Sequence, residues 1–230
     1  MKPVSQSPIH DKNARLIGWL LEELEDPFAF FPIRSVGRSL RQLLEETNEG
    51  FLQRQGPHGV ARKYWDVPSE LLHEEIGLLL GAAFVLAQAT LTQTISMLSR
   101  IRHLTGTATS LPEAKTAILT LEATFHDRTK LSHLAVIDLA ANFFKHHHEW
   151  PEDWSVQASK GQQTRTIQNC TMLGMSPREV TLNLYAAMHA LGSSGSDVEI
   201  IQACIQEWRG RLARRLYQEL GISDPADDCL

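Results

Sequence analysis

The densest group of residues able to carry out acid–base chemistry lies between His126 and Trp150. Within it, Arg128 and His133 stand in an Arg-x4-His arrangement. An arginine can hold a phosphate by paired hydrogen bonds, and a histidine with a pKa near neutrality can move a proton. Cleavage of an RNA phosphodiester by its own 2′-hydroxyl needs these two groups and no metal ion. Arg128 and His133 are therefore the predicted catalytic pair.

Five nearby polar side chains are predicted to contact the same substrate. Asn142, Lys145 and His146 are spaced i, i+3 and i+4, so they share one helix face and offer an amide, a cation and a titratable ring to an anion. Asp127 and Lys130 lie on either side of the arginine of the pair. In the alternative interpretation these are solvated residues, since Lys and His near the C-terminus of a helix interact favourably with its dipole.

The consecutive residues His146, His147 and His148 suggest a competing metal site. Neighbouring residues of a helix point about 100° apart, so all three cannot bind one ion. Two of them could do so with Glu149 and a remote histidine. The chain has no His-Glu-x-x-His spacing, and surface histidines explain the run more simply. We therefore predict no metal ligand and no cofactor.

The segment Arg128-Thr-Lys-Leu-Ser-His133 follows a long predicted helix and resembles the HEPN superfamily of all-α nucleases and nucleotide-binding proteins. The shared mark of that family is Arg-x4-6-His at the beginning of a late helix. The resemblance covers roughly residues 68–150, and it departs from the family pattern at Thr129, where Asn, His or Asp is usual. It implies a metal-independent ribonuclease of a toxin or phage-defence type. It also implies a homodimer in which two Arg–His pairs face one RNA groove, with an antitoxin as a candidate protein partner.

A hypothesis of a different class is a non-catalytic helical interaction protein, either an adaptor or a regulatory subunit. In that case the same polar residues belong to the surface and the core. The two hypotheses differ in what they require of the fold. A nuclease must expose Arg128 and His133 together in a groove, whereas an interaction protein can bury either one.

The elements that must position these residues are helices. The longest periodic run covers residues 70–104, contains no proline and is apolar all round in its middle, which is typical of a helix surrounded by others. Helical patterns also cover residues 13–25, 35–48, 112–125, 130–148, 164–173, 177–191 and 197–220. Residues 51–67 contain Gly56, Pro57 and Gly59, which favour an irregular connection. No sustained alternation of period two indicates a sheet. The predicted fold is an all-α multi-helix bundle around a long central helix.

The domain organisation follows from composition. Apolar residues make up 43% of the 230 residues, enough for a substantial core. Residues 1–150 are predicted to form the main helical bundle, and the polar composition of residues 151–163 predicts a linker. Residues 164–230 are predicted to form a C-terminal helical region packed on the same core.

Charge and cysteine content limit the functional classes. The 27 acidic and 22 basic residues are spread along the chain, so any RNA contact must be local. Three widely separated cysteines without a Cys-x-x-Cys spacing favour a reducing compartment. Residues 1–13 do not resemble a secretory signal, and the apolar stretch of residues 76–89 is shorter than the roughly 20 residues that span a bilayer. We therefore predict a cytoplasmic protein without membrane contact.

Overall fold

The computed structural model describes residues 11–55, 67–154, 162–177, 179–193, 195 and 197–223. Within these ranges the chain is all-α and has no strand, only an isolated bridge between Phe125 and Ser132. The predicted fold class is therefore confirmed. The helices are α1 (Asp11–Glu25), α2 (Phe31–Gln55), α3 (Val67–Thr105), α4 (Lys115–Ile118), α5 (His133–His146), α6 (Gln162–Met172), α7 (Val180–Ala190) and α8 (Glu199–Leu220).

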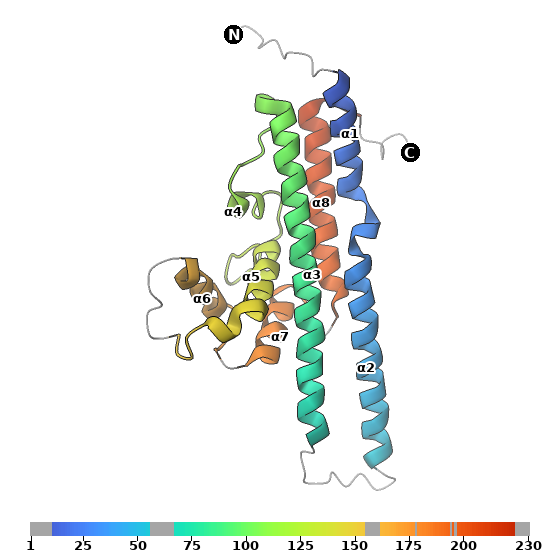
Figure 1. Ribbon diagram of the computed structural model, residues 1–230, viewed down its shortest axis with the longest axis vertical. Helices are drawn as coiled ribbons and strands as arrows, with labels where there is room; N and C mark the ends of the chain where they lie inside the picture. The colour runs from blue at the N-terminus through green and yellow to red at the C-terminus, as the bar shows by residue number, and fades with distance from the viewer. Residues whose placement is uncertain are drawn as a thin grey trace.

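The central helix is α3, at 39 residues the longest of these helices. It contacts α1, α2, α5, α7 and α8, and its side chains at Leu80, Phe84 and Leu91 are buried. Figure 1 shows α1 and α2 following one another along α3, with α8 beside them, so that these four helices form a rod. The helices α4 to α7 gather on one side of this rod. The long apolar run of the sequence therefore forms the axis of the bundle.

Residues 71–108 are long and apolar enough to cross a membrane by length and composition. In the bundle, 56% of the most apolar window of this stretch is buried. A buried core helix passes the same test of length and hydropathy, because it too is surrounded by apolar groups.

Two glycines of α3 set how closely the neighbouring helices approach it. A Cβ atom at Gly77 would overlap the side chain of Thr181 in α7, and a Cβ atom at Gly81 would overlap the ring of Phe144 in α5. The two glycines are four residues apart and share one face of α3. The absence of side chains at these two positions allows α5 and α7 to approach the central helix closely.

The N-terminus of α5 is fixed by Ser132. Its hydroxyl accepts a hydrogen bond from the backbone N–H of Ala135 at 3.1 Å and donates one to the carbonyl of Leu119 at 2.7 Å. This is the usual geometry of an N-cap. The helix predicted from residue 130 therefore begins at His133, and the Arg-x4-His segment precedes the helix instead of opening it.

The helix predicted over residues 112–125 is wrong over most of its length, because only Lys115–Ile118 is α-helical. Side chains of α8 bind carbonyls that a helix would have used. The indole of Trp208 donates to the carbonyl of Leu121 at 2.9 Å, and Arg211 donates to the carbonyl of Glu122 at 2.8 Å. Glu122 also has a φ of 53°, which ends the helical turn.

The boundaries of α2 also differ from the sequence prediction. The helix predicted over residues 35–48 is longer at both ends, and five residues of the predicted irregular connection belong to α2. Gly50 lies inside this helix, where glycine costs about 1 kcal/mol but does not by itself end a helix. Residues 56–66 of the connection and residues 155–161 of the predicted linker lie outside the described residues.

Candidate functional site

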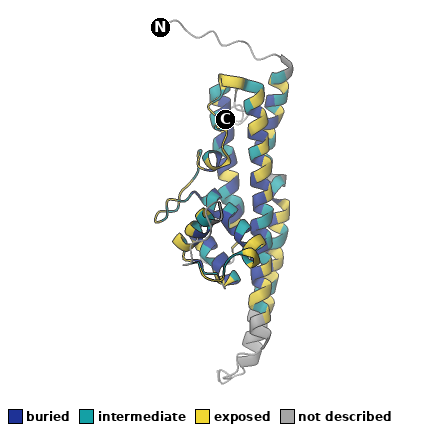
Figure 2. Ribbon diagram, turned by 60° about the vertical axis from the view of Figure 1, so that its left-hand side comes forward, coloured by how far each residue is buried: buried dark blue, intermediate teal, exposed yellow. Residues whose placement is uncertain are grey.

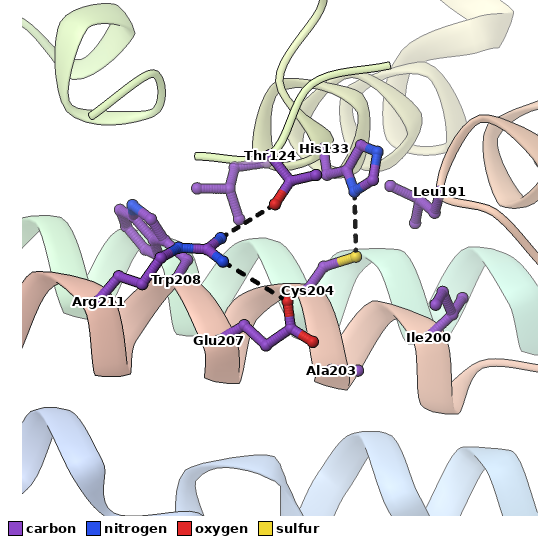
Figure 3. Close-up of a pocket in the computed structure, with 10 residues that line it drawn as sticks. Thr124, His133, Leu191, Ile200, Ala203, Cys204, Glu207, Trp208 and Arg211 are labelled. Atoms are coloured by element: carbon purple, nitrogen blue, oxygen red, sulfur yellow. Dashed lines mark hydrogen bonds and ion pairs between the residues drawn. The ribbon is translucent and has the colours of Figure 1, made fainter. Parts of the chain in front are cut away.

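A small cavity of about 120 Å³ lies between the first turn of α5 and the middle of α8. Figure 3 shows His133 and Thr124 on one side of this cavity and α8 on the other. The wall also includes apolar side chains such as Leu191 and Ile200. We call it the His133 pocket, and its polar lining residues are Thr124, His133, Cys204, Glu207 and Arg211.

The imidazole of His133 is half-buried, and its Nδ1 atom lies 3.5 Å from the sulfur of Cys204. Burial is the largest cause that lowers the pKa of His133 below 6.5, and electrostatic interactions with His126 and Arg211 act in the same direction. The carboxylates of Glu207 and Asp127 oppose this shift. The ring is therefore mostly neutral at pH 7, a state in which a histidine can accept a proton.

The thiol of Cys204 is not a nucleophile in this environment. Burial, assisted by the nearby negative charge of Glu207, raises its pKa to about 11. The reactive form of cysteine is the thiolate, and at neutral pH almost all of this group is protonated. The contact between Cys204 and His133 is therefore a weak hydrogen bond within the fold.

The guanidinium of Arg211 is held by groups of the protein. Its Nε atom donates to the carbonyl of Glu122 at 2.8 Å, and its Nη2 atom donates to the hydroxyl of Thr124 at 3.1 Å. Its Nη1 atom lies 3.7 Å from a carboxylate oxygen of Glu207, one turn earlier in α8. These contacts tie the segment before α5 to α8.

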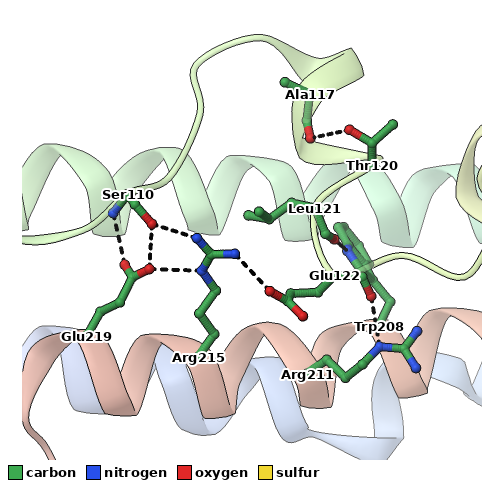
Figure 4. A network of polar contacts seen from close by, with 9 residues as sticks. All are labelled: Ser110, Ala117, Thr120, Leu121, Glu122, Trp208, Arg211, Arg215 and Glu219. Carbon is green, nitrogen blue, oxygen red and sulfur yellow. Dashed lines mark hydrogen bonds and ion pairs between the residues drawn. The ribbon is translucent and has the colours of Figure 1, made fainter.

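A second network continues this connection along α8. Arg215 donates to Glu122 at 2.8 Å and to Glu219 at 2.8 Å, and it also donates to the hydroxyl of Ser110 at 2.7 Å (Figure 4). The carboxylate of Glu219 in turn accepts hydrogen bonds from the backbone N–H and the hydroxyl of Ser110. Much of the irregular segment between α3 and α5 is thus fastened to one face of α8.

The predicted catalytic arginine lies on a turn that precedes α5. The backbone N–H of His126 donates to the carbonyl of Leu131 at 2.8 Å, and the N–H of Lys130 donates to the carbonyl of His126 at 2.9 Å. Arg128 is exposed at the tip of this turn together with Asp127 and Lys130, and Lys130 has a φ of 58°. Arg128 does not line the His133 pocket. The arginine that lines the pocket with His133 is Arg211.

Two of the three residues predicted to share a face of α5 do meet in one network. The amide of Gln88, buried on α3, donates to Asn142 at 3.0 Å and to Asp138 at 2.7 Å. Lys145 donates to the carbonyl oxygen of the same amide at 2.6 Å. His146 instead contacts Glu149, with 3.2 Å between its Nδ1 atom and the carboxylate.

This network also contains residues that the sequence reasoning missed. Lys115 of α4 donates to the carboxylate of Asp138 at 2.8 Å, so Asp138 receives hydrogen bonds from both Lys115 and Gln88. The signal that could have found it was a glutamine in the most apolar part of the longest helix. A buried amide needs hydrogen-bonding partners, and facing polar residues of another helix supply them.

No group of three or more His, Cys, Asp or Glu side chains among the described residues is arranged to hold a metal ion. In the histidine run, His146 and His148 both approach Glu149, at 3.2 and 3.6 Å. The ring of His147 instead points back to the carbonyl of Phe144 at 2.9 Å.

No protein-family model, curated protein or solved structure matches this chain. The resemblance to the HEPN superfamily therefore stays a prediction.

Proposed function

We propose that this chain is a non-catalytic helical interaction protein, an adaptor or a regulatory subunit. The observation that supports this proposal is the state of the polar groups in the His133 pocket. His133 contacts the protonated thiol of Cys204, and Arg211 is held by Glu207, Thr124 and the carbonyl of Glu122. Groups that bind one another in this way connect two parts of a fold, and a substrate would have to displace them.

The pocket then has a structural role. The guanidinium of Arg211 donates a hydrogen bond to the carbonyl of Glu122, which lies outside the helix α4. Hydrogen bonds that involve a charged group contribute about 1.5–3 kcal/mol to stability. Trp208 likewise donates a hydrogen bond to the carbonyl of Leu121 (Figure 4). In this proposal the side chains of α8 hold the segment before α5 in place, and the function resides on the outer surface.

The outer surface has large apolar side chains that suit contact with another protein. Trp19, Phe31, Leu71, Leu78 and Leu182 are each more than half exposed. Leu71 and Leu78 are seven residues apart, so they lie on one face of α3. Figure 2 shows exposed residues in yellow along the outer sides of the rod. Single exposed apolar residues are common, but two along one face of α3, together with three on other helices, favour a partner surface.

The experiment that tests this proposal measures stability and RNA cleavage in the same variants. We expect no cleavage of a mixed RNA pool by the full chain, and a lower melting temperature in both His133→Ala and Arg211→Ala. Arg128→Ala is the matched control, because its side chain is exposed on the turn and its loss should leave the melting temperature unchanged. RNA cleavage that disappears in His133→Ala at an unchanged melting temperature would overturn the proposal.

A metal-independent ribonuclease is the second candidate, and one observation favours it. The His133 pocket combines a neutral imidazole, the carboxylate of Glu207 and the guanidinium of Arg211, which is an acid–base set beside a phosphate-binding group. In this candidate His133 is the general acid or base, and Arg128 or Arg211 holds the phosphate. Cleavage would survive chelators and fall by about 10²–10⁴-fold in His133→Ala.

A further inference from the structure

A groove of about 660 Å³ lies between α2 and α8, and Ala203 lines both this groove and the His133 pocket. Three arginines of α2, namely Arg34, Arg38 and Arg41, line one side. Gln202 and Gln206 of α8 line the other side. We call it the α2–α8 groove.

The three arginines are spaced as one stripe along α2. They lie at positions i, i+4 and i+7, which fall on the same face of a helix. With a rise of about 1.5 Å per residue, their Cα atoms are separated along the axis by about 6 Å and about 4.5 Å. A second helix that lies along the groove in the same direction as α2 repeats this unequal spacing when its own residues are at i, i+4 and i+7.

The groove has a net positive charge, because three arginines and one carboxylate, that of Glu199, line it. Arg34 donates to the neutral amide of Gln202 at 3.1 Å, and Arg38 donates to the hydroxyl of Ser35 at 3.3 Å. Arg41 pairs with Glu199 at 2.6 Å, but both side chains are about 60% exposed. Surface ion pairs of this kind contribute little, so a carboxylate from a partner can replace Glu199 at small cost.

An aromatic side chain lies in the same groove. Phe31 is 61% exposed and lies at the start of α2. The guanidinium of Arg38 lies 6.0 Å from the centre of its ring. An exposed aromatic residue beside arginines is a common centre of binding energy in protein interfaces. The face of the ring that Arg38 approaches is less available for stacking with a nucleic-acid base.

We propose that the α2–α8 groove binds an acidic amphipathic helix of a partner protein. This inference rests on the proposed function and names the chemistry of the partner. Carboxylates at i, i+4 and i+7 of that helix pair with Arg34, Arg38 and Arg41, with the two-point geometry that arginine and carboxylate share. An apolar residue of the same helix covers Phe31. Helices commonly bind in grooves between two other helices by such a set of anchors.

The test uses the full chain and a designed helical peptide of about 20 residues, long enough to form a helix by itself. The peptide has glutamates at i, i+4 and i+7 and a leucine at the position that meets Phe31. A control peptide has glutamines in place of the glutamates. We expect fluorescence anisotropy to detect binding of the acidic peptide that weakens as salt is raised, and at least about tenfold weaker binding of the control peptide.

Variants of the protein locate the binding surface. Arg34→Gln combined with Arg38→Gln should weaken peptide binding by at least about tenfold. The matched control combines Arg15→Gln with Arg100→Gln, which removes the same charge from exposed arginines outside the groove and should leave binding unchanged. Glu199→Gln should tighten binding, because it frees Arg41 from its ion pair.

Several results would overturn the inference. Equal binding of both peptides, or no binding of either, would show that the stripe does not recognise carboxylates. Tighter binding of a single-stranded RNA that depends on Arg34 and Arg38 would make the groove a nucleic-acid site. Self-association lost in the same variants would make the occupant a second copy of the chain. None of these results affects the outcome of the stability and RNA-cleavage measurements on the His133 and Arg211 variants. Failure of this inference can therefore be distinguished from failure of the proposed function.

Discussion

Replacement of Gly81 by alanine tests whether the close approach of α5 to the central helix limits the stability of the bundle. A Cβ atom at this position would overlap the ring of Phe144. Overpacking of this kind costs about 1–3 kcal/mol, while replacing glycine by alanine inside a helix contributes about 0.5–1 kcal/mol of stability. The overlap is with atoms of the aromatic ring, so the cost should lie in the upper half of that range, about 2–3 kcal/mol, and the expected net loss is about 1–2.5 kcal/mol of unfolding free energy.

The control and the rescue both come from the same chain. Gly18 lies inside α1 with no atom within 4 Å of the Cβ position, so Gly18→Ala should stabilise the protein by about 0.5–1 kcal/mol. Phe144→Leu removes the ring that the added Cβ atom would meet, and it should cost less in the Gly81→Ala background than alone. Urea denaturation followed by circular dichroism measures the unchanged chain and all of these variants. If Gly81→Ala were as stable as the unchanged chain, the close packing of α3 against α5 would be refuted.

Three further predictions concern the core, the buried amide and pH. Leu80→Asp should abolish the cooperative thermal transition seen by circular dichroism. An unpaired buried charge costs several kcal/mol, against a total free energy of unfolding of roughly 5–15 kcal/mol. A near-normal melt would show that this face of α3 is not buried. Gln88→Ala should lower the urea unfolding free energy by about 2–4 kcal/mol, since it removes the four hydrogen bonds of this side chain and leaves a cavity. A loss below about 0.5 kcal/mol would mean that water replaces the network. The pKa of His133 is lower in the folded chain than its ordinary 6.5, so the unfolded chain takes up this proton first and stability should fall as pH drops below 6.5. Denaturation at several pH values should show this slope in the unchanged chain and a smaller one in His133→Gln, whereas equal slopes would place the titrating group elsewhere.

The fold was predictable where the pattern is long and local. The run of residues 70–104 contains no proline and is apolar all round in its middle, so the central position of α3 followed from the sequence. The segment before α5 was not predictable in the same way. Its helical pattern is interrupted because Trp208 and Arg211 bind the carbonyls of Leu121 and Glu122, and these residues are distant in sequence.

The candidate site was likewise predictable only where its residues are close together in the sequence. The spacing of Asn142 and Lys145 placed both on one face of α5, and both meet Gln88. The Arg-x4-His spacing, in contrast, singled out Arg128 because it is near His133 in the sequence. The arginine that lines the pocket with His133 belongs to α8, and no local pattern relates the two positions.

The contact between α1 and α8 has a consequence for how the chain folds during synthesis. These are the first and the last helices of the described chain, and they pack along one another. At about 5–20 residues per second, α1 leaves the ribosome roughly 10–35 s before α8 begins to appear. During that interval the side of α1 that packs against α8 is not yet covered by it. Limited proteolysis of ribosome-arrested chains should therefore cleave α1 until α8 has emerged. A chaperone that binds short apolar helices can bind α1 during this interval. A stop codon before α8 leaves the side of α1 that packs against α8 exposed.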